Sequence, residues 1–345
     1  MTDNERFFLC IRNWLTVFLP KQRCLSENTI KAYKVSLNLL IDFLRTEKKL
    51  PISKIGFETI NQKIVSEFIE WLDTARRCGT ETQNSRLMAL RSFFHYAGIV
   101  DISCVALELE IKKVSKKKSS GKMVEFLSEN ALKVLLEAPD IKTKLGLRNR
   151  FLMIFMYDTA ARCQEILDIK LKDFILTGNK RYVYLTGKGG KQRSVPLLPK
   201  TVRHYEQYLS LFHPEPQSGE NYVFYTVSHN QKHQMSTDNV QAFMKKYGEQ
   251  ARQFCHEIPL RVHPHQLRHT RAMHLYRAGW PLPFVSELLG HAKITTTNIY
   301  AYADTEMKRK ALEKIISPTM FLTSDSTRPE WKNDDDMILT LSGLR

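Results

Sequence analysis

The sequence has no paired cysteines and no long hydrophobic run, and each absence excludes a class of protein. Its cysteines are scattered with no C-x-x-C pair, which argues against a zinc ribbon or a disulfide framework and predicts reduced thiols. The longest apolar stretches, such as 151–157, fall far short of the roughly 20 residues that a bilayer span needs. The N-terminus is too polar and acidic for a signal peptide, so we expect a cytoplasmic protein.

What the sequence does have is size and positive charge. Its 345 residues are enough for two ordinary domains, and 43% hydrophobic residues can give each domain a core. Lys and Arg total 52 against 36 Asp and Glu, which leaves a formal net charge of +16. This excess favours a polyanionic partner such as nucleic acid, although a membrane surface would also suit that sign.

The first third of the chain is patterned as helices. Ser26 is a plausible N-cap, and a glycine, Gly98, is placed to end the last helix of this part. Apolar residues recur at helical spacing over 7–18, 26–44, 64–72 and 87–94. The pattern predicts a compact bundle of about four helices over 1–111.

A lysine-rich segment follows the bundle. Residues 111–122 hold six lysines and almost nothing to bury, so we expect an extended, solvated linker at 112–123. Such a linker is usually only a soluble connection, but a basic one could also lie along a phosphate backbone. The candidate DNA-binding residues here are Lys112, Lys113, Lys116, Lys117 and Lys118.

The second part, 124–316, mixes helices and strands. Its fold class is therefore α+β, mainly helical with a small β-sheet, and a tail follows at 317–345. Helical patterns cover 128–137, 146–158, 201–212, 237–254 and 264–277. Strands are expected at 182–186 and 193–197, joined by a glycine turn, with a further short strand possible at 222–225.

The stretch HPHQLRH, 263–269, raises the question of a metal site. His265 and His269 lie four residues apart, as in zinc proteases, but the glutamate that would act as base is missing. Arg268 also lies near His265 on the expected helix, where a cation would repel a metal ion. A histidine and an arginine at this spacing suit a phosphate better, although on its own the pair is a weak signal.

Two further segments carry basic residues. Arg162 has Glu165 three residues later, where the carboxylate could orient the guanidinium, or the pair could be an ordinary surface ion pair. The hairpin GKGGKQR places Lys188 and Lys191 at a turn and Arg193 just after it, with strands on both sides, so it is neither a P-loop nor a Rossmann fingerprint. A lysine at a hairpin tip can enter a groove and donate a proton to a leaving oxygen. Lys191 and Arg193 are additional DNA-binding candidates.

Together these motifs resemble a known family. They are T-x-x-R-x-x-E at Arg162, G-K-G-x-K-x-R-x-V-P-L at Lys188, H-x-L-R-H at His265 and Arg268, and L-L-G-H with nine residues to Tyr300. Motifs in this order are similar to those of the tyrosine recombinases, the phage integrase and Xer-like group. The resemblance covers the second part of the chain.

The N-terminal part is similar to the family's core-binding domain in size and in the T-x-x-x-Y start at Thr29. The chain departs from the family at Ala160 and Ala161, where glycine and leucine are common, and at Gln164, where serine is common. These departures concern the turn before Arg162 and not the arginine itself.

The resemblance implies a helical core-binding domain and a mixed catalytic domain that form a C-shaped clamp on DNA. It implies a 3′-phosphotyrosyl intermediate, no metal and no cofactor, with partners that are double-stranded DNA carrying inverted-repeat sites and further copies of the chain, as a tetramer. The implied catalytic residues are Arg162, Lys188, His265, Arg268, His291 and the nucleophile Tyr300, with Glu165 in support.

Two alternatives remain open from the sequence. A type IB topoisomerase also uses a tyrosine among basic residues, but the chain length and the GKGGK and LLGH contexts favour a recombinase. A catalytically silent DNA-binding regulator would be expected to have lost active-site residues, and all six are present.

Overall fold

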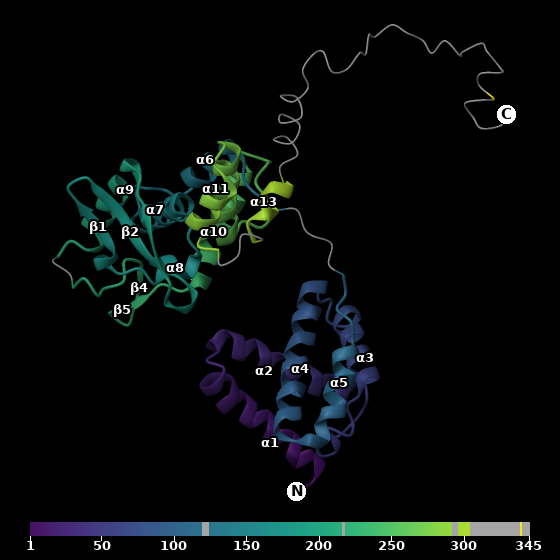
Figure 1. Cartoon of the computed structure of the whole chain (residues 1–345). Helices are drawn as coiled ribbons and strands as arrows, with labels where there is room; N and C mark the ends of the chain where they lie inside the picture. The colour runs from purple at the N-terminus through teal and green to yellow at the C-terminus, as the bar shows by residue number, and fades with distance from the viewer. Residues whose placement is uncertain (119–123, 216–217, 292–295, 304–338, 340–345) are drawn as a thin grey trace. The chain divides into compact units, whose positions relative to one another are not determined.

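The chain forms two compact units. The computed structural model describes residues 1–118, 124–215, 218–291, 296–303 and 339, shown in colour in Figure 1. Unit 1 is Met1–Lys122 and unit 2 is Met123–Arg345. The helix expected over 305–316 and the tail at 317–345 lie outside the described residues, apart from residue 339. The clamp concerns the placement of one unit against the other and stays a prediction.

Unit 1 is a bundle of helices. Ser26 caps the second long helix as predicted, because its hydroxyl accepts a hydrogen bond from the Thr29 amide. Tyr33 on this helix stacks on Trp14, with ring centroids 5.4 Å apart. The helices are α1 (Asp3–Asn13), the π-helical η1 (Trp14–Gln22), α2 (Glu27–Thr46), α3 (Gln62–Thr74), α4 (Thr80–Val100) and α5 (Val105–Lys113), with 3-10 turns at Ile52–Lys54 and Ile102–Cys104.

Two expectations for unit 1 were wrong. Gly98 does not end its helix, since α4 continues to Val100. A Cβ at Gly98 would lie 2.5 Å from a carboxylate oxygen of Glu108, so this glycine allows α5 to pack closely against α4. The segment expected to be an extended linker begins as a helix. α5 runs to Lys113, and its residue Ile111 is buried in the core of unit 1.

Unit 2 combines helices with a small sheet. Strands β1 (Phe174–Thr177), β2 (Lys180–Thr186) and β3 (Gln192–Pro196) form an antiparallel sheet in that order, and β4 (Tyr225–Ser228) pairs with β5 (Gln231–Gln234). The helices are α6 (Glu129–Glu137), α7 (Lys144–Thr159), α8 (Cys163–Leu167), α9 (Pro199–Phe212), α10 (Thr237–Arg252), α11 (Pro264–Arg277), α12 (Leu282–Leu289) and α13 (Asn298–Ala303).

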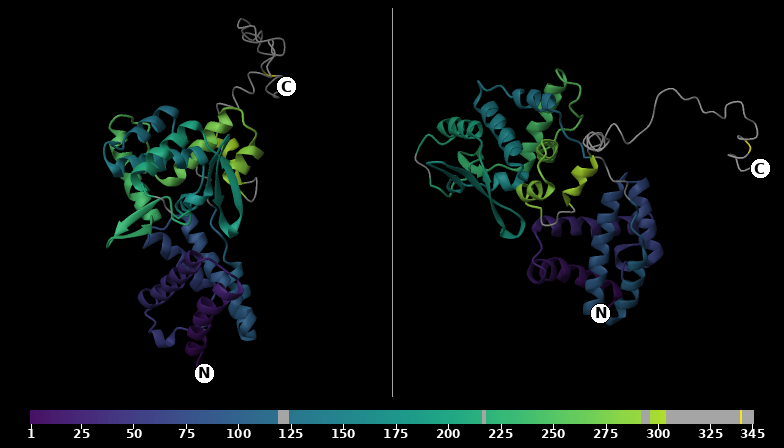
Figure 2. Two further views of the ribbon diagram at one scale, coloured as in Figure 1. Left: turned by 90° about the vertical axis from the view of Figure 1, so that its left-hand side faces the viewer. Right: turned by 45° about the horizontal axis from the view of Figure 1, so that its top comes forward.

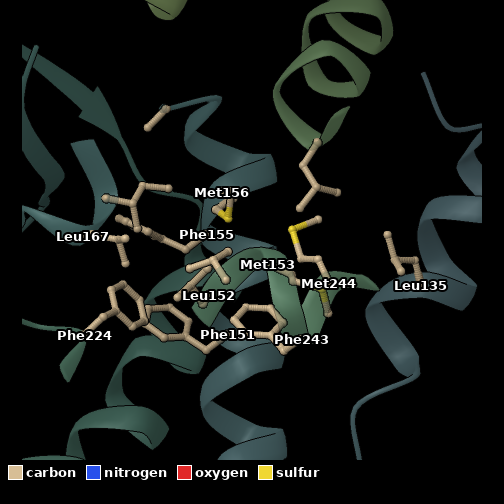
Figure 3. Packing of buried hydrophobic residues seen from close by; sticks show 14 of the residues in the cluster. Leu135, Phe151, Leu152, Met153, Phe155, Met156, Leu167, Phe224, Phe243 and Met244 are labelled. Atoms are coloured by element: carbon tan, nitrogen blue, oxygen red, sulfur yellow. The ribbon is translucent and has the colours of Figure 1, made fainter. Parts of the chain in front are cut away.

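The core of unit 2 is built around the second half of α7, where residues 151–157 are apolar and are buried or half-buried. Figure 3 shows Phe151 and Phe155 of this helix beside Phe224, with Met244 of α10 nearby. The sheet lies at one edge of the unit with α7 and α9 next to it, and α11 and α13 lie beyond them (Figures 1 and 2). α7 therefore lies between the sheet and the last helices of the unit.

The fold class predicted from the sequence, mainly helical with a small β-sheet, is confirmed, and all five helices expected in unit 2 are present. The hairpin of β2 and β3 is also present, whereas β1, α8 and α12 were not expected. The strand expected at 222–225 starts only at Tyr225 and continues to Ser228. No helix in the described residues is long and apolar enough to cross a membrane.

Candidate active site

Arg162 lies at the turn between α7 and α8. Its main chain is the N-cap of α8, and Glu165 closes a capping box by accepting a hydrogen bond from the Arg162 amide at 3.0 Å. The same carboxylate accepts from the Arg162 side chain, with Nη1 and Oε1 2.6 Å apart. Ala160, two residues earlier, has φ of 51°, a left-handed conformation that favours glycine, the residue common in the family at this position.

Glu165 holds a second arginine as well. It is 5% exposed, and its Oε2 accepts a hydrogen bond from Nη2 of Arg193 at 2.7 Å. Burial raises the pKa of Glu165, but hydrogen bonds from Arg193 and Arg162 outweigh it, so the pKa is lowered overall. The carboxylate is therefore charged at neutral pH and fixes two guanidinium groups, one from α8 and one from β3.

Three arginines from different elements cap the C-terminal end of α12. Arg193 donates to the first of three consecutive carbonyls at 3.1 Å, Arg268 to the second at 2.6 Å and Arg162 to the third at 3.4 Å. Positive charge at this end of a helix is stabilised by the helix dipole. The carbonyls belong to Leu288, Leu289 and Gly290.

Gly290 makes this capping possible. Its φ of 64° is left-handed, and a Cβ there would lie 2.9 Å from Nη1 of Arg193. The glycine of the LLGH motif therefore ends α12 and lets Arg193 approach its last turn. The same turn directs the next residue, His291, toward the arginines at the end of α12.

Arg268 comes from the centre of α11 and is 3% exposed. Its second terminal nitrogen donates to the Ala160 carbonyl at 2.7 Å, so both ends of the guanidinium are fixed by main-chain oxygens. Burial, together with the charge of Arg162, lowers the pKa of Arg268 to about 10. It remains charged at neutral pH, as an anion-binding group must.

The histidines of the two motifs are neutral at physiological pH. Burial first, and then positive charge nearby, lowers the pKa of His265, and it lowers the pKa of His269 and His291 to about 4 each. Nδ1 of His291 lies 2.9 Å from the hydroxyl of the buried Thr297, which precedes α13. Neutral imidazoles can both donate and accept hydrogen bonds beside a phosphate.

Tyr300, on α13, has 0% of its surface exposed. Its ring packs in an apolar cluster, and its hydroxyl lies 2.8 Å from Nδ1 of His269. Burial raises the pKa of Tyr300 to about 12, so the hydroxyl is protonated. The apolar cluster consists of Ala160, Ala272, Met273, Leu275, Val285 and Leu289.

A cavity of about 570 Å³ lies beside the capped end of α12. It brings together predicted residues from three motifs, namely Arg162, Lys191 and His291, whereas Tyr300 does not line it. Four of its lining residues are basic, which suits an anion. The lining residues are Arg162, Gly187, Lys191, Gln192, Arg193, Glu287, Gly290 and His291.

The remaining predicted lysines are in two places. Lys188 begins the turn of the β2–β3 hairpin, and its side chain lies outside the described part. In unit 1, Lys112 pairs with Glu108, and Lys117 pairs with Asp73 at 2.8 Å. The side chains of Lys113, Lys116 and Lys118 are exposed.

Sequence reasoning missed two features of this site. His269 was considered only as a metal ligand, but its ring contacts the Tyr300 hydroxyl, and no group of three metal-binding side chains occurs among the described residues. Arg193 was expected to contact DNA, yet it is 16% exposed and is directed inward to Glu165 and Leu288. Side chains alternate between the two faces of a strand, and this alternation could have suggested that Arg193 points inward.

Known proteins match this chain along most of its length. The Phage integrase family matches residues 125–307, and the N-terminal SAM-like domain of phage integrases matches residues 13–98. Tyrosine recombinase XerD of Listeria monocytogenes is 31% identical over 306 residues, 87% of this chain and 96% of XerD. Tyrosine recombinase XerA of Pyrococcus horikoshii is 28% identical over 292 residues, 84% of this chain and 88% of XerA.

A solved structure shares the fold. It is the XerH site-specific recombinase bound to palindromic difH substrate in a post-cleavage complex, with a TM-score of 0.64 and 23% identity, covering 91% of this chain and 89% of that chain. These relatives favour neither the topoisomerase nor the silent regulator. With two integrase domains in the expected order, the chain belongs to the phage integrase family and is a tyrosine site-specific recombinase.

Proposed function

We propose that Tyr300 cleaves DNA by attacking a phosphodiester held on Arg162 and Arg268. The tyrosyl oxygen would form a bond to phosphorus, the 5′-oxygen would leave, and the product would be a 3′-phosphotyrosyl link and a free 5′-hydroxyl. Attack by a 5′-hydroxyl of a partner strand would reverse the step and join new ends. The bond energy is kept in the covalent enzyme, so neither a cofactor nor a nucleotide triphosphate is required.

One observation carries this proposal. Arg162 and Arg268 are far apart in sequence, yet both donate to adjacent carbonyls at the end of α12. Two fixed guanidiniums at one place suit the charge that builds on phosphoryl oxygens, and each would contribute about 3 kcal/mol in the transition state. This is the task that a metal ion performs in other phosphoryl-transfer sites.

The other residues of the motifs would move protons or hold the phosphate. Lys188 would protonate the departing 5′-oxygen, and His265 would act as general acid or base toward the tyrosine. His291 would donate a hydrogen bond to a phosphoryl oxygen. Glu165 would support the reaction indirectly, because it fixes Arg162.

A test of the nucleophile uses a nicked duplex that traps the covalent intermediate. Tyr300→Phe should bind the DNA site with unchanged affinity and give no protein covalently attached to it, because the phenyl ring has no oxygen to attack. The matched control is Tyr302→Phe, a second tyrosine in the same sequence segment, which should be trapped normally. Normal trapping of the Tyr300 variant would show that another group is the nucleophile.

The DNA substrate is proposed to be a duplex with inverted-repeat sites, bound by four copies of the chain in the cytoplasm. Contacts from both units would close the clamp around DNA, with the lysines at 112–118 and Lys191 on its backbone, which predicts steep salt dependence. The segment 305–316 is proposed to dock on a neighbouring copy. Deletion of residues 305–345 should then weaken pairing of two sites, measured by gel shift, more than binding to one site.

A further inference from the structure

The ring of His291 contacts a buried threonine. Its Nδ1 lies 2.9 Å from the hydroxyl of Thr297, a residue with 0% of its surface exposed. The imidazole is half-buried and lines the cavity beside the end of α12, together with Arg162. Of the two ring nitrogens, Nδ1 is engaged within the described part of the protein, so Nε2 is the one left for a ligand of the cavity.

The main chain of His291 is fixed separately from its ring. Its amide donates a hydrogen bond to the carbonyl of Ser286 on α12, at 3.1 Å. With the main chain held there, the imidazole could still rotate about its two side-chain bonds. Among the described residues, the hydrogen bond to Thr297 is the polar contact that restricts this rotation.

The burial of Thr297 decides which group donates in this hydrogen bond. His291 is neutral at physiological pH because burial, and then the charge of nearby arginines, lowers its pKa to about 4, so its ring carries one N–H. If that hydrogen were on Nδ1, the Thr297 hydroxyl would have to accept, and the described residues offer its own hydrogen no other acceptor. A buried donor without a partner costs about 1–3 kcal/mol, so the hydroxyl donates and Nδ1 accepts.

We propose that Thr297 is a positioning residue that fixes the tautomer and the orientation of His291, so that Nε2–H is presented to the phosphate. This inference rests on the proposed role of His291 as a donor to a phosphoryl oxygen. In the opposite tautomer, Nε2 would present a lone pair to that oxygen, and the two would repel each other. The tautomer therefore decides whether His291 helps or hinders the binding of a phosphate.

A role as the cap of α13 is the structural alternative for Thr297. A threonine before a helix commonly accepts a hydrogen bond from a first-turn amide through its side chain. Here the first-turn amide of Tyr300 donates instead to the main-chain carbonyl of Thr297, at 3.1 Å, and the hydroxyl contacts His291. The main chain of Thr297 thus serves the helix, and its side chain serves the imidazole.

The tautomer can be measured directly by NMR on the full-length protein labelled with ¹⁵N in its histidines, without DNA. The two ring signals of His291 are assigned by their loss in His291→Gln. In the wild type, Nδ1 should give the chemical shift of a bare nitrogen and Nε2 that of a protonated one. Thr297→Val keeps the shape and removes the hydroxyl, so both shifts should move toward the average of two tautomers. Thr297→Ser keeps the hydroxyl and should give the wild-type pattern.

The second measurement is the single-turnover rate of covalent trapping on a nicked duplex at saturating DNA. Thr297→Val should react about tenfold more slowly than the wild type, in line with the loss of one hydrogen bond, and Thr297→Ser close to the wild-type rate. Affinity for the duplex should stay near the wild-type value, because contacts along the phosphate backbone dominate it. The matched control is Thr296→Val at the neighbouring, exposed threonine, which should react at the wild-type rate.

A double variant distinguishes positioning from a general loss of structure. If Thr297 acts through His291, Thr297→Val should have no further effect on the trapping rate in a His291→Gln background. The same tenfold loss in that background, or an unchanged tautomer in Thr297→Val alone, would overturn the proposal. If the Val variant does not fold by circular dichroism, Thr297→Ala, which also lacks the hydroxyl, takes its place with the same expected outcomes.

This proposal and the proposed function can fail separately. The tautomer is measured without DNA, so it tests the contact between Thr297 and His291 even if the imidazole never meets a phosphate. A wild-type trapping rate for His291→Gln would contradict the proposed role of His291 in cleavage and leave the NMR result standing.

Discussion

The arginine side of the site and the tyrosine side are built in opposite ways. Arg162 is fixed by a buried carboxylate and Arg268 by main-chain carbonyls, and an open cavity lies beside Arg162. Among the described residues, the Tyr300 hydroxyl contacts a neutral histidine, and the side chain has no exposed surface. The groups that would bind the substrate are already in place, whereas the group that would react with it is buried.

This difference separates recognition from chemistry. Guanidinium groups that are held in one place before a phosphate arrives reorganise little, which lowers the barrier once reaction begins. The experiments with the largest expected effects act on the arginine side.

The largest effect is expected from Glu165→Gln. The substitution keeps the shape of the side chain and removes the charge that holds Arg162 and Arg193. Because the carboxylate is buried, its loss leaves two guanidiniums uncompensated, and we expect the free energy of unfolding to fall by about 3 kcal/mol. Urea denaturation measures this change, and covalent trapping on a nicked duplex should fall with it.

The matched control is Glu220→Gln. Glu220 also pairs with two cations, Lys170 and Lys172, but Glu220 and Lys172 are exposed to solvent and Lys170 is half-buried. Exposed ion pairs contribute little to stability, so this variant should unfold close to the wild type. Equal destabilisation by both variants would mean that Glu165 does not organise the arginine pocket.

A smaller effect is expected to distinguish Arg193 from Lys191, two basic residues of the β2–β3 hairpin. Arg193 points inward to Glu165 and Leu288, whereas Lys191 is exposed at the cavity. Arg193→Gln should lower the rate of covalent trapping about tenfold, in line with the cost of misplaced catalytic groups, without changing DNA affinity. Lys191→Gln should do the reverse, weakening binding and making the dependence of affinity on salt less steep by about one charge.

Filter binding over a range of salt concentrations and single-turnover trapping give both quantities. An Arg193 variant that lost affinity and salt dependence like the Lys191 variant would place Arg193 on DNA, as its sequence position first suggested. The comparison therefore decides whether Arg193 positions catalytic groups or contacts DNA.

The sequence predicted the arginine side better than the tyrosine side. The resemblance to the tyrosine recombinases identified Arg162 and Arg268, and the structure brings both to the end of α12. Short motifs carry this information because each residue has its role within one turn or one loop. The pairing of His269 with Tyr300 joins two helices, and no local pattern in either segment encodes that contact.

The fold shows the same limit. Helices with long apolar stripes were predicted, because periodicity over many residues is a strong signal. The short α8 and α12 were not, since five or eight residues give too few turns for a pattern. The prediction of an extended linker at 111–122 was wrong for a different reason. Ile111 and Val114 are two apolar residues among the lysines, and both are buried in the core of unit 1.

The smallest effect is expected from pH and tests the tyrosine side. The pKa of His269 and that of His291 are lowered to about 4 in the folded chain from an ordinary value of 6.5. As pH falls below about 6.5, the unfolded chain binds protons that the folded chain does not, so stability decreases until pH reaches about 4.

Calorimetry should therefore show a melting temperature that falls between pH 7 and pH 5. Other histidines whose pKa is lowered, such as His265 and His274, contribute with the same sign. The double variant His269→Asn with His291→Asn isolates the contribution of these two histidines, and it should show a shallower fall than the wild type. An identical fall in both proteins would mean that these imidazoles gain protons as readily in the folded chain as in the unfolded one, and that the tyrosine side is more open to water than its burial indicates.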